Sequence, residues 1–151
     1  MNEEELFEKA KKELQSYNYC SQRITKAELE ILQLQAQAEK ITTVISKMPK
    51  AKNSQKTKEN TWAELIDLKE ELKNLLIEDQ IKKVNIVKKI KKVIEQDEEL
   101  GTILQLKYLG RNVTNAELAK RQGYQKRYFL KKVKKAIEMY SKIDNVGGTN
   151  E

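Results

Sequence analysis

The sequence contains no histidine and only one cysteine among its 151 residues. Zinc sites are built largely from histidine and cysteine ligands, and hydrolases of the Ser-His-Asp and Cys-His types need a histidine base. We therefore expect neither an enzyme nor a metal or cofactor site. Cys20 falls on an apolar helical stripe, which predicts a small core residue, and the lack of a second cysteine to pair with it fits a reducing compartment.

Proline and glycine are also scarce, at one and five residues, while charged residues make up 35% of the chain and hydrophobic residues 38%. This balance favours long amphipathic helices over a sheet. No apolar run approaches the roughly 18 residues of a membrane span, and the acidic N-terminal stretch lacks the apolar core of a signal peptide. We expect an all-α, cytoplasmic protein that does not act on membranes.

Helical spacing dominates the first part of the chain. Apolar residues from Tyr17 to Met48 alternate steps of three and four, which predicts a helix over about 3–48 with a coiled-coil-like seam. The polar stretch 49–60 begins with the only proline and predicts a loop, and a second helix is predicted over about 61–95. The two helices would form an antiparallel hairpin domain, 1–96, that closes on itself or on a second subunit. The lysines of residues 82–92 predict a solvated face, with auxiliary phosphate contacts as the alternative.

A smaller domain is predicted over 97–143. It opens with a helix over about 98–109, and Thr114 and Glu117 then stand three apart, as in a capping box that begins a second helix. Gly123 suits the left-handed backbone that ends that helix and reverses the chain. A third helix over about 125–142 carries one apolar stripe, made of Phe129, Val133, Ala136, Ile137 and Tyr140. The pattern is that of a three-helix unit with a helix-turn-helix, followed by a tail, 144–151, that we expect to be disordered.

Positive charge is concentrated on this second domain. Residues 107–135 contain ten lysines and arginines and one acidic residue, a net charge of +9, so the remainder of a chain of net charge +7 sums to −2. Folding does not require this segregation, whereas binding to double-stranded DNA would explain it.

The second helix of a helix-turn-helix enters the major groove, and its first turns reach the base edges. The predicted base-reading residues are Gln125, Lys126, Arg127, Tyr128 and Lys131. The predicted phosphate contacts are Thr114, Lys120, Arg121, Lys134 and Lys135. We expect Tyr124 in the core, and we expect Gln125 to cap its helix less well than serine or threonine would.

The order of three runs, LQLKYL, TNAELAKRQGY and a basic helix ending in KKAIEMY, resembles region 4 of bacterial sigma factors. Upstream, EKITTVISKMP, a polar loop and WAELIDLKEEL resemble short phage and prophage proteins with a helical hairpin before such a module, similar to RinA and ArpU type regulators of late transcription. The resemblance covers about 17–143 and implies a DNA-binding transcription regulator at the bacterial nucleoid. It also implies that the hairpin serves dimerisation or contact with RNA polymerase.

The sequence departs from the sigma pattern at Gln125, at Lys132 and in the length of the GRNV link before Thr114. Two other classes of function also combine these elements. One is a small terminase-like component of DNA packaging, although such proteins tend to carry the reader at the N-terminus. The other is a helical adaptor that binds RNA polymerase without reading DNA, and a basic helix face argues against it.

Overall fold

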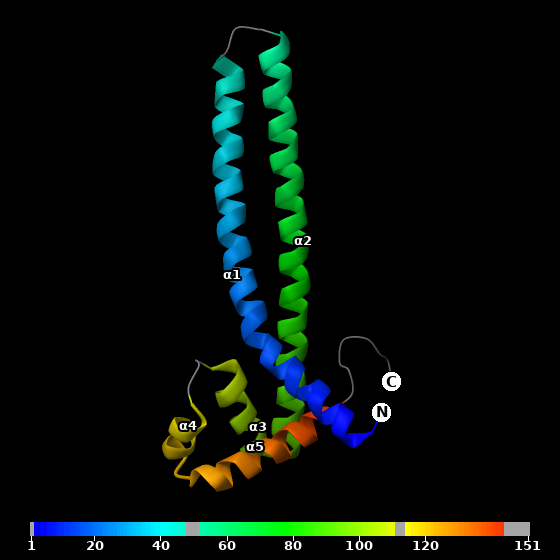
Figure 1. Ribbon diagram of the computed structural model, residues 1–151, viewed down its shortest axis with the longest axis vertical. Coiled ribbons are helices and arrows are strands. Elements are labelled where there is room, and N and C mark those ends of the chain that lie inside the picture. The colour runs from blue at the N-terminus through cyan, green and yellow to red at the C-terminus, as the bar shows by residue number, and fades with distance from the viewer. Residues whose placement is uncertain (1, 48–51, 111–113, 144–151) are drawn as a thin grey trace. The chain divides into compact units, whose positions relative to one another are not determined.

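The computed structural model describes residues 2–47, 52–110 and 114–143, and the surroundings of the side chains in 2–43, 58–110 and 114–143. Within these ranges all the regular structure is helical, which confirms the predicted all-α class. In chain order the elements are α1 (Glu3–Lys47), α2 (Lys52–Gln96), α3 (Glu98–Leu104), the π-helical turn η1 (Gln105–Leu109), α4 (Asn115–Arg121) and α5 (Lys126–Ser141) (Figure 1). No helix in the described part of the chain combines the length and the apolar character needed to cross a membrane.

The second long helix begins earlier than the sequence predicts. Residues 49–60 were expected to form a loop, but α2 starts at Lys52, and Thr61, where the second helix was predicted to begin, lies inside it. The prediction was wrong because residues 52–60 contain no glycine or proline and include several lysine, glutamine and glutamate residues, whose helix propensity is high. Pro49 lies outside the described residues, as does the predicted disordered tail, 144–151.

The described chain divides into two compact units. Unit 2 is residues 22–80, where the later part of α1 and the earlier part of α2 lie antiparallel. Arg23 donates from Nε to Asp79 Oδ2 at 3.0 Å and from Nη2 to Asp79 Oδ1 at 2.9 Å. Asp79 is buried, and the two-point geometry of an arginine with a carboxylate fixes which residues of the helices face each other. Ile24, Ala27 and Ala38 are buried on the α1 side of this unit.

Unit 1 is residues 1–21 and 81–151, so it does not begin at the predicted boundary near residue 97. Apolar side chains from the start of α1 and the end of α2 share one core with those of α3, η1, α4 and α5. Leu14 and Val93, for example, belong to the same buried cluster as Leu104 and Phe129. The short C-terminal helices alone have too little apolar surface to form this core, and the ends of the long helices supply the rest.

A polar network joins three helices of unit 1. The Tyr140 hydroxyl on α5 donates to Glu13 Oε1 on α1 at 2.7 Å. Lys89 on α2 donates to the same carboxylate, at 3.1 Å to Oε1 and 3.3 Å to Oε2. Lys89 was expected on a solvated face or at a phosphate, and the structure instead places it in this ion pair. Burial, followed by the hydrogen bond to Glu13, raises the pKa of Tyr140.

The predicted helix over 98–109 is confirmed, with a π-helical turn at its end. Asp97 caps α3 because its side chain accepts a hydrogen bond from the Leu100 amide at 3.1 Å. Gly101 lies so close to α2 that an added Cβ would stand 2.6 Å from both the Cα and the amide nitrogen of Ile94. In η1, burial raises the pKa of Tyr108 to about 12.

Candidate nucleic-acid interface

The segment 114–141 begins with a capped helix. The Thr114 hydroxyl accepts from the Glu117 amide at 3.2 Å, which confirms the predicted start of α4. The Glu117 carboxylate accepts a hydrogen bond from Arg121 Nη2 at 3.1 Å. Leu118 and Ala119 are buried against the core, so α4 is held by its apolar side and leaves its polar side in solvent.

A tight turn at Gly123 connects α4 to α5. Gly123 has a φ of 75°, the left-handed conformation that glycine adopts at little cost. Its amide donates to the Lys120 carbonyl at 3.1 Å, and the Tyr124 amide donates to the Ala119 carbonyl at 2.8 Å. These bonds satisfy carbonyls at the end of α4, and the chain direction changes within a few residues. The predicted glycine turn is therefore confirmed.

The helix that follows has one side committed to the core. Its buried residues are the predicted stripe: Phe129, Val133, Ala136, Ile137 and Tyr140. Gln125 occupies the cap position with φ −71° and ψ 145°, but its side chain makes no capping hydrogen bond, as expected. α5 therefore begins at Lys126, close to the predicted start.

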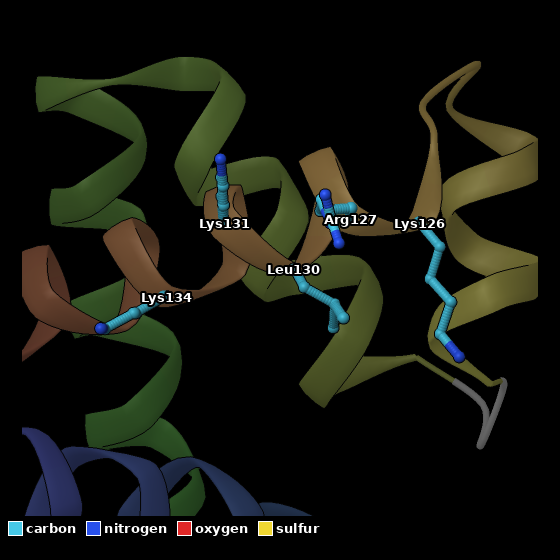
Figure 2. Close-up of a pocket in the computed structure, with 5 residues that line it drawn as sticks. All are labelled: Lys126, Arg127, Leu130, Lys131 and Lys134. Atoms are coloured by element: carbon cyan, nitrogen blue, oxygen red, sulfur yellow. The ribbon is translucent and has the colours of Figure 1, made fainter.

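The solvent side of α5 carries a continuous basic strip, which we define as Lys126, Arg127, Leu130, Lys131 and Lys134. These five residues line one shallow hollow on α5 (Figure 2). At 3.6 residues per turn, the spacings of four place Lys126, Leu130 and Lys134 in one row, with Arg127 and Lys131 in the row beside it. All five are exposed. None of the four cations has a carboxylate within ion-pair distance among the described residues.

The other predicted base-reading residues lie near the strip. Gln125 is exposed directly before it. Tyr128 is 47% exposed, but at 100° per residue it projects from the flank of the strip. Its ring packs edge-on to Tyr124, with centroids 5.2 Å apart. The structure thus brings Gln125, Lys126, Arg127 and Lys131 together, with Tyr128 at the side.

The predicted phosphate contacts are distributed around this strip. Thr114, Lys120 and Arg121 are exposed on or beside α4, and Arg121 is held by its ion pair with Glu117. Lys134 belongs to the strip. Lys135 is exposed just outside it, next to Lys131 around the helix. Such an arrangement places cations on both helices that flank the turn.

Lys132 has a structural role that its charge alone does not reveal. Its Nζ lies 2.7 Å from Glu99 Oε1 on α3 and 5.3 Å from the centroid of the Tyr128 ring. The hydrogen bond from Lys132, then that from Tyr124, lowers the pKa of Glu99, and the pKa of Lys132 is raised in return. Tyr124 was expected in the core and is partly buried against it, stacked at 6.4 Å on Phe129. Lys132, where the sequence departs from the sigma pattern, is therefore paired with a specific acidic residue, Glu99.

Acidic residues border the far end of the basic strip. Glu3, Glu4 and Glu8 of α1 line a hollow together with Lys134 and Glu138 of α5. Positive potential is therefore greatest along the first two turns of α5 and is offset toward its C-terminal end. A polyanion would approach α5 most favourably at its N-terminal half.

Leu130 is the one residue of the strip that the sequence reasoning did not single out. It is 41% exposed and lies at the edge of the buried stripe, where that stripe meets the basic residues. The sequence feature that could have identified Leu130 is a leucine among basic residues, which a pattern of charge alone does not reveal.

No protein family profile, curated protein or solved structure matches the chain. Among the described residues there is also no group of three or more histidine, cysteine or acidic side chains placed to hold a metal ion.

Proposed function

We propose that this chain binds double-stranded DNA in a sequence-specific manner, with α5 as the recognition helix in the major groove. The observation that carries the proposal is the basic strip, because its four cations are exposed, close together and free of carboxylate partners in the described chain. Placing like charges side by side costs free energy in the isolated protein, and a polyanionic partner would recover that cost.

The dimensions of the segment fit this role. A helix with side chains is about 10–12 Å across and the major groove is about 12 Å wide. With α5 in the groove, Gln125, Lys126, Arg127 and Lys131 face base edges and Tyr128 lies at the groove wall. The candidate phosphate contacts are exposed on the same two helices: Thr114, Lys120 and Arg121 on or beside α4, and Lys134 and Lys135 on α5.

The biological setting we propose is transcription regulation by a phage or prophage protein. Its support is the resemblance of 17–143 to sigma region 4 preceded by a helical hairpin. Unit 2 adds an observation, because it exposes several large apolar side chains: Leu29, Leu32, Trp62, Leu68, Leu75 and Ile77. Exposed apolar residues in number favour a protein partner, so dimerisation or RNA polymerase contact is proposed for this unit.

The same apolar residues favour one second candidate, a helical adaptor that binds RNA polymerase without reading DNA. The two functions differ in a direct measurement. An adaptor would fail to bind duplex DNA at low salt and would still bind purified polymerase. The other alternative, a terminase-like packaging component, would form a ring of many subunits, which native mass spectrometry of the full chain would detect.

The test begins with selection of bound duplexes from a random library by the full chain, followed by titration of the enriched duplex by fluorescence anisotropy. The variant Lys126→Ala with Arg127→Ala should lose roughly 5–150-fold in affinity for each bidentate base contact that it removes. It should retain less discrimination between enriched and random duplex. The slope of log affinity against log salt should change little in this variant, whereas Lys134→Ala with Lys135→Ala, which removes two candidate phosphate contacts, should lower its magnitude by about two.

The matched control is Lys9→Ala with Lys12→Ala. Both lysines are exposed on α1 in unit 1, and the change in net charge is the same. This control should leave discrimination unchanged. If the α5 double variant discriminated as well as the parent, α5 would not be the recognition helix.

A further inference from the structure

Leu130 lies at the centre of the basic strip. Lys126 and Lys134 are one turn before it and one turn after it, and Arg127 and Lys131 occupy the neighbouring row. Figure 2 shows the Leu130 side chain projecting away from the α5 ribbon between Lys126 and Lys134. An apolar side chain therefore has cations one turn before it, one turn after it and along one side, while the buried residues Val133 and Ile137 lie on its other side around the helix.

The core does not account for this leucine. The buried residues of α5 include Phe129 and Val133, and Leu130 is rotated by about 100° from Phe129 around the helix. Leu130 is not part of the buried cluster, nor is it among the partly buried residues packed against that cluster. Its side chain is instead 41% exposed among the cations of the strip.

The bases of the major groove differ in apolar character. Guanine, adenine and cytosine present hydrogen-bond donors and acceptors there, whereas thymine alone adds a C5-methyl group. Lysine and arginine pair with guanine or with phosphate, so the cations of the strip cannot recognise that methyl group. A leucine in their midst can.

We propose that Leu130 determines specificity by packing on the C5-methyl group of a thymine in the bound sequence. This inference rests on the proposed function, because it requires α5 to lie in the major groove. It predicts that the bound sequence contains a thymine next to the bases or phosphates that Lys126, Arg127 and Lys131 contact.

The test uses the duplex enriched by the full chain from a random library, with each thymine replaced in turn by deoxyuracil, which lacks only the methyl group. The parent should lose about fourfold in affinity at one or two positions, the effect of removing one buried methyl group from an interface. In Leu130→Ala the same replacements should have almost no effect. Leu130→Met, which keeps an apolar side chain of similar size, should retain the sensitivity.

The matched control is Leu106→Ala, which truncates a leucine of similar exposure, 37% against 41%, on η1 of the same unit. It should bind with the parental thymine sensitivity, and circular dichroism should show that both alanine variants stay folded. If Leu130→Ala kept the parental response to deoxyuracil, or if the parent showed no response at any thymine, the inference would be overturned although DNA binding stood. If the library yielded no bound duplex, the proposed function itself would fail.

Discussion

The hydrogen bond between Tyr140 and Glu13 gives a sharp prediction about what holds α5 in place. The change Tyr140→Phe removes only the hydroxyl that donates to Glu13 Oε1 at 2.7 Å. Tyr140 is 1% exposed, so its ring stays in the core and the packing is unchanged. The expected effect is loss of stability in unit 1 without a change in helix content at low temperature.

The magnitude follows from the state of the acceptor. A hydrogen bond to a charged group contributes about 1.5–3 kcal/mol. Glu13 keeps its ion pair with Lys89 at 3.1 Å and is partly exposed, so water can replace the lost donor. We therefore expect the lower end, about 1.5 kcal/mol in the free energy of unfolding.

Urea unfolding followed by circular dichroism measures this difference. Tyr19→Phe is the matched control, because Tyr19 is 66% exposed on α1 and its hydroxyl should contribute less than about 0.5 kcal/mol. A double-mutant cycle with Glu13→Ala, which removes the acceptor, then isolates the pair, since the second change should cost less once Tyr140 is phenylalanine. Equal stability of Tyr140→Phe and Tyr19→Phe would refute the argument that this bond ties α5 to α1.

Three further predictions concern the same unit. Gly123→Ala should lower the free energy of unfolding by about 1–2 kcal/mol, the cost of a left-handed backbone alone, because the added Cβ meets nothing within 4 Å. Gly101→Ala should be more destabilising, because its Cβ would stand 2.6 Å from backbone atoms of Ile94. Thermal unfolding of the two variants measures the difference. The fragment 97–151 should be largely unfolded by circular dichroism, because it lacks the core residues of α1 and α2; a folded fragment would contradict the shared core. The pKa of Tyr108 is raised from 10.0 to about 12, so its stabilisation is present below pH 10 and lost as pH rises through 12. Between pH 10 and pH 12 this loss is roughly 2 kcal/mol, and it should be missing in Tyr108→Phe, as urea titrations at both pH values would show.

The sequence predicted the local features of the C-terminal segment well. The cap at Thr114, the turn at Gly123 and the buried face of α5 all appear where the spacing placed them. Each of these features depends on residues within about one or two helical turns, so periodicity and turn chemistry contain the necessary information. The same holds for the missing side-chain cap at Gln125.

Apart from the start of α2 at Lys52, the features that the sequence did not reveal depend on contacts between distant residues. Lys89 could not be separated from its exposed neighbours, because its partner Glu13 lies on another helix, 76 residues away along the chain. The pairing of Lys132 with Glu99 was hidden for the same reason. The extent of the shared core likewise depends on how the ends of α1 and α2 pack, which no local pattern encodes.

The two sides of α5 illustrate how fold and proposed function divide one helix. Its buried side uses Phe129, Val133 and Tyr140 to join α5 to the core and to Glu13, so the direction of the helix is fixed by long-range contacts. On its exposed side, none of the four cations of the basic strip forms an ion pair in the described chain. A recognition helix needs this division, because base readout requires side chains that are free to bind on a backbone that is already held in place. The rigidity that Tyr140 contributes at one end of α5 would then favour binding at the other, by reducing the conformational entropy lost when DNA is bound.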